Sequence, residues 1–269
     1  MDHGRRADYL RAIGIDVWVP RVGIVGALGA PVELEKPKPA EPARAAARAA
    51  AAAAMPAGEM DEAPAPQGQG PGWAERWEAL RGEVLRCTQC GLHAGRTQGV
   101  VGVGNPQAEW MVIGEAPGAE EDRRGEPFVG RAGQLLDAML RAIGLSRAEN
   151  VYIANVLKSR PPNNRDPRPE EVAACLPYLR RQIELVRPRL LLAVGRIAAQ
   201  NLLGTEEPLS RLRGRVHQFG ELNTPLVVTY HPAYLLRNPA DKRKAWEDLK
   251  FARSVFRQLT GVSEDGHRS

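Results

Sequence analysis

The stretch from Trp110 to Gly133 constrains the fold most strongly, because a strand, a loop and a helix follow one another within it. The apolar run Trp110-Met111-Val112-Ile113 ends at Gly114 and predicts a short buried strand. After a loop, a helical pattern starts at Gly130, and its apolar residues fall on one face: Leu135, Leu136, Met139, Leu140 and Ile143. Open α/β sheets are built from units of this order.

The alternation of strand and helix patterns continues along the chain. Further strands are predicted at 151–155, 190–194 and 225–230, and helices at about 73–86, 169–186, 195–203 and 240–258. We therefore expect an α/β fold in which helices cover both faces of a parallel sheet.

The N-terminal third differs in composition from this domain. Residues 1–35 contain a short amphipathic pattern that is too small to bury a core of its own. Residues 36–72 are rich in alanine and proline, and they predict a disordered linker because burial cannot offset their ordering entropy. We expect the globular domain at 73–262 and a C-terminal tail at 263–269.

Two interpretations of the N-terminal tail stay open. Its segment YLRAIGIDVWVPR, from Tyr9 to Arg21, resembles the N-terminal peptide of the bacterial clamp-loader psi subunit. That resemblance implies a docking peptide for a replication or repair protein. The alternative is a terminal tail without a partner.

Charge and cysteine usage limit the class of protein. A net charge of +5 and a pI near 9.3 permit a polyanionic partner. Three cysteines in 269 residues do not make a disulfide framework, and the Cys87-Thr88-Gln89-Cys90 spacing fits metal or cluster ligation in a reducing compartment. No apolar run approaches the roughly 18–20 residues of a membrane helix. We expect a cytoplasmic monomer that does not bind membranes.

The loop that follows the first strand is a candidate active site. Ligands bind to open α/β sheets where loops leave the carboxyl ends of the strands. This loop carries Glu115, an acidic cluster at 120–122 and Phe128. A carboxylate and an aromatic ring in such a place favour catalysis, although a polar connection with one core Phe has the same spacing.

Three segments carry a family resemblance. GEAPG, EED and EPFVGRAGQLL, within 114–136, resemble the first motif of the family 4 uracil-DNA glycosylases, the bacterial and archaeal iron-sulfur type. VYIANVLKSRPPNNR, from Val151 to Arg165, and HPAYLLRNP, from His231 to Pro239, follow in family order. The resemblance spans roughly 87–259. It implies a three-layer α/β/α sandwich with a central, mainly parallel four-stranded sheet.

The resemblance also implies a reaction. The enzyme would hydrolyse the N-glycosidic bond of a flipped-out deoxyuridine in DNA and leave an abasic site for base excision repair. No lysine is placed as a Schiff-base nucleophile, which favours a monofunctional glycosylase. Two alternatives stay open: a non-catalytic DNA-binding replication-accessory protein, and a glycosylase for another damaged base.

Roles for individual residues follow from the same resemblance. Asn155 would recognise uracil, because a carboxamide can accept from N3–H and donate to O4. Phe128 would stack on the base, and His231 would donate a hydrogen bond to O2 as charge builds there. The catalytic carboxylate would be Glu115, with Glu121 as second choice for activating water. The backbone of Ala116 and Gly118 would lie against the uracil.

DNA contacts are expected from two loops. Leu235 and Leu236 fit an apolar wedge that replaces the extruded base, and Arg237 suits a phosphate contact. The alternative is that both leucines begin the core of the next helix, and we expect one of them to do so. In the loop SRPPNNRDP, the residues expected at the DNA backbone are Arg160, Asn163, Asn164 and Arg165.

The chain departs from the family pattern at one position of the cluster. The family binds a [4Fe–4S] cluster through four cysteines. This chain offers Cys87, Cys90 and Cys175, and Ser159 stands at the fourth position. Three outcomes stay open: a cluster with Ser159 or water on the fourth iron, a labile cluster, or no cluster. Because three cysteines stand at matching places, we expect a [4Fe–4S] cluster.

Overall fold

A computed structural model of the chain describes residues 72–261. The predicted docking peptide, most of the linker and the C-terminal tail therefore lie outside the described residues. Helix α3 (Trp73–Arg86) is the first described element. None of the described helices is both long and apolar enough to cross a membrane.

The described residues form an α/β sandwich around one six-stranded sheet, in the order β1-β3-β2-β4-β6-β5. The strands are β1 (Val103–Gly104), β2 (Trp110–Gly114), β3 (Val151–Asn155), β4 (Leu190–Val194), β5 (His217–Phe219) and β6 (Thr224–Thr229). The four central strands are parallel, as predicted, and the short strands β1 and β5 pair antiparallel at the two edges.

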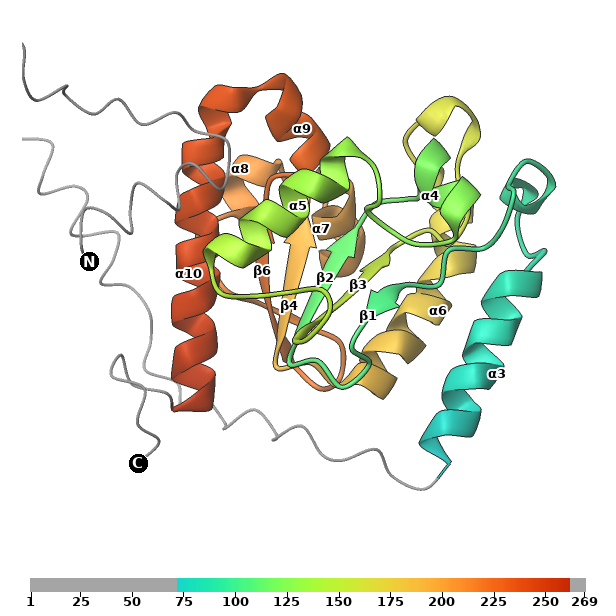
Figure 1. Cartoon of the computed structure of the whole chain (residues 1–269), viewed down its shortest axis with the longest axis horizontal. Coiled ribbons are helices and arrows are strands. Elements are labelled where there is room, and N and C mark those ends of the chain that lie inside the picture. The colour runs from blue at the N-terminus through green and yellow to red at the C-terminus, as the bar shows by residue number, and fades with distance from the viewer. Residues whose placement is uncertain (1–71, 262–269) are drawn as a thin grey trace, which may run out of the picture. The chain divides into compact units, whose positions relative to one another are not determined.

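Alternation along the buried strands builds a separate core on each face of the sheet. On β2, Trp110 and Val112 face a cluster with α5 and α10, whereas Met111 and Ile113 face a cluster with α6 and α7. Figure 1 shows α5 in front of the strands and α10 beside them at the left, with α6 at the right, behind β1. The expected three-layer arrangement is confirmed.

The helices complete the layers. The longer ones are α3, α5 (Arg131–Ala142), α6 (Pro169–Val186), α7 (Arg196–Leu203) and α10 (Lys242–Thr260). The short ones are α4 (Ala119–Arg124), α8 (Leu209–Leu212) and α9 (Pro232–Arg237), with turns η2 (Gly91–Ala94), η3 (Pro162–Asn164) and η4 (Pro239–Asp241). Helix α3 lies outside α6, where Leu80 and Val84 pack against Tyr178. Two segments expected to be loops, the acidic cluster and AYLLR, are the helices α4 and α9.

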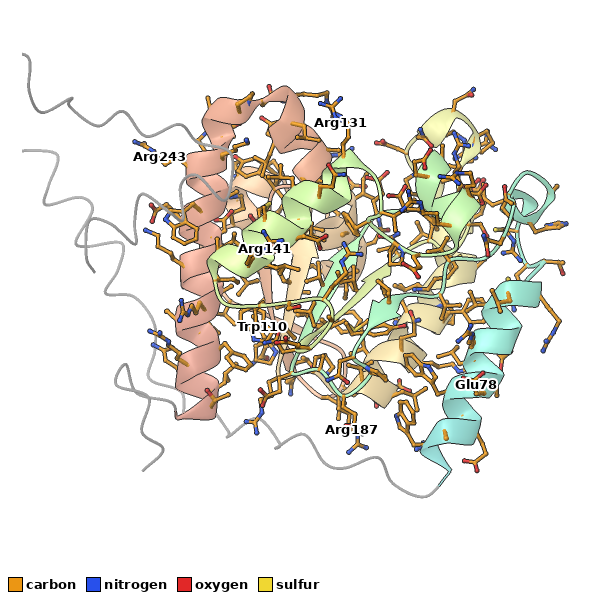
Figure 2. The ribbon with its side chains drawn as sticks, in the orientation of Figure 1. Glu78, Trp110, Arg131, Arg141, Arg187 and Arg243 are labelled. Carbon is orange, nitrogen blue, oxygen red and sulfur yellow. The ribbon has the colours of Figure 1, made fainter. Side chains whose placement is uncertain are left out.

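The two ends of the sheet differ in what they carry. At the start of β2, Trp110 packs its ring on Phe256 of α10, with centroids 4.9 Å apart (Figure 2). Arg187, which follows α6, lies at the same amino-terminal end as Trp110, whereas Arg131 begins α5 beside α9 at the other end (Figure 2). The loops that leave the central strands gather at this second end.

Candidate active site

The predicted site residues lie at one end of the parallel strands. Gly114 and Asn155 are register partners at the ends of β2 and β3. Beyond them the two chains stay paired, because the Leu157 N–H donates to the Glu115 carbonyl at 2.9 Å. His231 follows β6 directly after Tyr230. These residues lie at the carboxyl ends of the strands, which is where open α/β sheets bind ligands.

Asn155 and Phe128 meet over Gly114. A Cβ added to Gly114 would lie 2.5 Å from Asn155 Oδ1 and 2.6 Å from Phe128 Cζ, so any side chain here would collide with both. Asn155 is 2% exposed, and its Oδ1 accepts no hydrogen bond from the described residues. An unpaired buried polar atom costs about 1–3 kcal/mol. The carboxamide is therefore arranged to accept an N–H from a ligand.

Phe128 is held in a strained conformation. Its φ of +56° lies in the left-handed region, which is unfavourable for a bulky residue. Arg147 donates to the Phe128 carbonyl at 2.8 Å, and a Cβ on Gly133 would clash with that carbonyl at 1.7 Å. The Phe128 ring lies 5.5 Å from the ring of His231, tilted by 31°. Strain that the surroundings enforce in this way is typical of functional positions.

Glu121 ties the two halves of the loop together. Its Oε2 accepts from the Gly118 N–H at 3.1 Å, and its Oε1 accepts from the N–H groups of Val129 and Gly130 at 3.0 and 3.1 Å. Both carboxylate oxygens are thus engaged by the backbone on either side of Phe128. Neither Gly118 nor Phe128 can move far without breaking one of these bonds.

His231 is held as a neutral hydrogen-bond donor. It caps α9, and its Nδ1 accepts from the Ala233 N–H at 3.1 Å, so the ring proton resides on Nε2. Burial, together with the charge of Arg237, lowers the pKa of His231 to about 4, against an opposing effect of Glu121. At neutral pH the free Nε2–H can donate without carrying a charge.

Glu115 has an unusual protonation equilibrium for a carboxylate. Burial and the nearby charge of Asp166 raise the pKa of Glu115 to about 7, and Arg196 lowers it only in part. Asp166 and Arg196 form an ion pair of 2.8 Å. Perturbed carboxyl groups at a strand edge are candidates for acid–base chemistry. Ala116, the next residue, packs on the α6 side of the core.

The two leucines of AYLLR differ in environment: one of them belongs to the core, as expected, which corrects the predicted DNA contact of Leu235. Leu235 is 1% exposed and belongs to the core with α5 and α10. It cannot enter DNA without unfolding the domain. Leu236 is 36% exposed, and the neighbouring Arg237 is exposed as well. Of these two leucines, Leu236 alone presents its side chain to solvent, from the last turn of α9.

The second predicted DNA loop is ordered by its own side chains. Arg165 donates to both carboxylate oxygens of Glu171, which is buried at the start of α6. Arg160 donates to Asn164 Oδ1 at 2.8 Å. Asn163 and Asn164 have positive φ and are exposed. The loop thus presents polar groups at its surface, while Arg165 is already paired within the protein.

The cysteines lie near one another at the exit of α3 and on α6. Cys87 and Cys90 are partly exposed, whereas Cys175 is buried. Cys87 and Cys90 lie close enough to Cys175 to act on it electrostatically. Within residues 72–261 no three His, Cys, Asp or Glu side chains converge on a single metal-ion position. In a four-iron cluster each thiolate binds a different iron, so convergence on one ion is not required.

Two cations beside the cysteines were not identified from the sequence. Lys158 is 1% exposed, and its Nζ donates to the Asn155 carbonyl at 2.7 Å and to Gln182 Oε1 at 2.5 Å. Arg96 donates to Ser159 Oγ at 2.7 Å. Burial lowers the pKa of Lys158 to about 7, opposed by Cys175. The sequence offered one indication of Lys158, which is that it directly follows the motif residues Asn155, Val156 and Leu157. The strand pattern ends before Lys158, so it did not predict that this lysine is buried.

Comparisons with known proteins show which families this chain is similar to. The model of the uracil DNA glycosylase superfamily matches residues 101–250. A type-4 uracil-DNA glycosylase of Archaeoglobus fulgidus is 48% identical over 174 residues, which cover 62% of this chain and 87% of the relative. One from Thermotoga maritima is 43% identical over 188 residues, covering 68% and 96%. A type-5 uracil-DNA glycosylase of Thermus thermophilus is 36% identical over 149 residues, covering 49% and 68%.

Proposed function

Because this chain belongs to the type-4 uracil-DNA glycosylases and acts as a uracil-DNA glycosylase, we propose that Asn155, Phe128 and His231 form around Gly114 the pocket that binds the flipped-out uracil. In the reaction the bond between C1′ and N1 breaks, the base departs as an anion and the sugar becomes oxocarbenium-like. A water then adds its oxygen to C1′ and gives up a proton, and the uracil anion takes up a proton, so that free uracil and the abasic sugar are formed. The pocket must recognise the base, stabilise the anion and position the water.

Asn155 recognises the uracil edge. Its unpaired Oδ1, buried beside Phe128, is the observation that carries this proposal. Oδ1 accepts from uracil N3–H and the amide nitrogen donates to O4, whereas cytosine presents the opposite pattern at both atoms. Phe128 stacks on the base, and stacking of this kind contributes about 1–3 kcal/mol.

His231 stabilises the departing base. Its Nε2–H donates to uracil O2, where negative charge grows as the glycosidic bond breaks. A neutral imidazole serves as well as a charged one here, because the donor is fixed in place before the reaction. Removal of one such donor lowers the rate by about 10²–10³.

Glu115 acts on the attacking water and on the sugar, not on the base. With a pKa of about 7, a substantial fraction of Glu115 is ionised at neutral pH. The ionised form orients the attacking water and opposes the positive charge on the sugar. Glu121 acts instead as a positioning residue, because its two oxygens are already occupied by the backbone N–H groups of Gly118, Val129 and Gly130.

DNA is held on both sides of this pocket. Leu236 inserts where the uracil has left the stack, and Arg237 contacts a phosphate. The loop with Arg160 and Asn164 meets the DNA backbone, and Arg165 orders that loop through Glu171. A docking role for residues 1–35, activity on other damaged bases, a monomeric state and a cytoplasmic location stay predictions from the sequence.

Cys87, Cys90 and Cys175 hold a [4Fe–4S] cluster, and the buried Lys158 supports the fit. Its ammonium group has two neutral acceptors, the Asn155 carbonyl and Gln182, and burying an uncompensated charge is costly. The Lys158 backbone N–H and side chain both approach Cys175. An anionic cluster bound by thiolates would compensate this cation. Bound there, the cluster supplies structural support to the strand exit that carries Asn155.

Exchange of the recognition group tests the proposal. An Asn155→Asp enzyme should gain excision of cytosine and lose excision of uracil, because a carboxylate accepts from the cytosine amino group. Asn223→Asp makes the same change at an exposed position outside the proposed site and is the matched control. Release of each base from labelled oligonucleotides is measured. Unchanged selectivity in Asn155→Asp would refute the role of the carboxamide.

A further inference from the structure

We propose that Ser159 does not replace the missing cysteine, and that the cluster is held by three thiolates with its fourth iron open to a small exogenous anion. The ligand is a solvent hydroxide or a low-molecular-weight thiolate. This inference rests on the proposed cluster, and it is independent of the glycosylase activity.

The Ser159 hydroxyl is buried and accepts a hydrogen bond from an anchored arginine. Ser159 is 3% exposed, and Arg96 Nη1 donates to its Oγ at 2.7 Å. The other amino group of Arg96 donates to the carbonyls of Leu85 and Cys87 at 2.8 and 3.1 Å. The guanidinium is therefore anchored to the segment that carries Cys87 and is fixed against the serine oxygen.

Ligation of iron by Ser159 would have to overcome this arrangement. A hydroxyl must lose its proton to bind iron well, and it does so much less readily than a thiol. The oxygen also reaches less far from Cβ than a sulfur would. In addition, Arg96 Nη1 occupies one lone pair of Oγ, and the carbonyls of Leu85 and Cys87 hold the guanidinium in place, so an iron on Oγ would have to bind beside it.

The three cysteines need no fourth ligand from the chain to keep a cluster. Cys87 and Cys90 come from the segment after α3, and Cys175 comes from α6, so the two layers are already bridged. Lys158 and Arg96 bring two cations to this region. They favour an anionic assembly but offer no lone pair to iron. The fourth iron is then exchangeable.

Oxidation tests this directly in the full-length protein, reconstituted without oxygen from ferrous iron and sulfide. Ferricyanide takes one electron from the cluster, and an iron without a protein ligand then leaves as Fe²⁺. We expect the wild type and Ser159→Ala to lose one iron per cluster and to show the EPR signal of a three-iron cluster. Ser159→Cys should keep all its iron.

Two results would overturn the proposal. One is a wild type that resists oxidation while Ser159→Ala loses iron, since Ser159 would then be a ligand. The other is failure of every variant to bind iron, although uracil excision persists. Titration of the wild-type cluster with an aromatic thiol needs no variant: we expect a change in visible absorption that saturates at one thiol per cluster, and no change would count against the open iron.

Discussion

Replacement of Glu121 by glutamine separates a positioning role from a catalytic one. The Glu121 carboxylate accepts three backbone hydrogen bonds, one from Gly118 and two from the segment after Phe128. The side-chain oxygen of a glutamine can still accept from the N–H groups of Val129 and Gly130. Its NH₂ group would face the Gly118 N–H, and because both are donors, that hydrogen bond is lost. The loop that carries Phe128 should therefore loosen, while no group that touches the reacting atoms is lost.

The expected magnitude follows from the bonds. A hydrogen bond to a charged group contributes about 1.5–3 kcal/mol. Glu121→Gln loses one such bond and weakens two, and relaxation of the loop recovers part of the loss. A net cost of about 2–3 kcal/mol in the bound state corresponds to a decrease of roughly 30–150-fold in kcat/KM. Because the stacking position of Phe128 is affected, KM should rise as well.

Steady-state excision of uracil from a labelled oligonucleotide measures both constants. Glu120→Gln is the matched control, because Glu120 is exposed and its carboxylate forms an ion pair with Arg123 at the surface. Equal activity of the two variants would refute the positioning role. A loss of about 10³-fold or more in kcat with KM unchanged would instead assign water activation to Glu121.

The remaining predictions concern pH and the two leucines. Since burial raises the pKa of Glu115 to about 7, its carboxylate is lost as pH falls through that value, and kcat/KM should fall about tenfold per pH unit below roughly pH 6. Asp166→Asn should move this limb of the pH–rate profile to lower pH, and an unmoved limb would contradict the assignment. Leu235→Ala should lower the free energy of unfolding by about 2–5 kcal/mol in denaturant titrations. Leu236→Ala should change it by less than about 0.5 kcal/mol yet slow excision from duplex more than from single-stranded DNA, and equal slowing on both substrates would exclude a wedge.

The strands and long helices were predictable because their apolar patterns are unbroken. Strands β2, β3 and β4 contain the predicted runs, and β6 (Thr224–Thr229) is shifted by one residue from the predicted 225–230. The edge strands β1 and β5 have two and three residues, too few to show a period. Helix α4 was missed because five of its six residues are charged, so no apolar face indicates a helix.

The side-chain partners could not be predicted, because they join residues far apart in the chain. Arg96 and Ser159 are separated by 63 residues and Lys158 and Gln182 by 24. Likewise, the burial of Leu235 beside the exposed Leu236 depends on the packing of α9 against α5. The motif residues were identifiable from the sequence, but the groups that hold them in place became visible only in the folded chain.

Release of uracil from a labelled oligonucleotide by the wild type, Asn155→Ala and His231→Ala tests the central claim most directly. We expect the wild type to release uracil and leave an intact strand with an abasic site. His231→Ala should be slower by about 10²–10³ through loss of the donor to O2. Asn155→Ala should lose recognition of the base. DNA binding without release of uracil, or variants as active as the wild type, would contradict the assignment of the pocket.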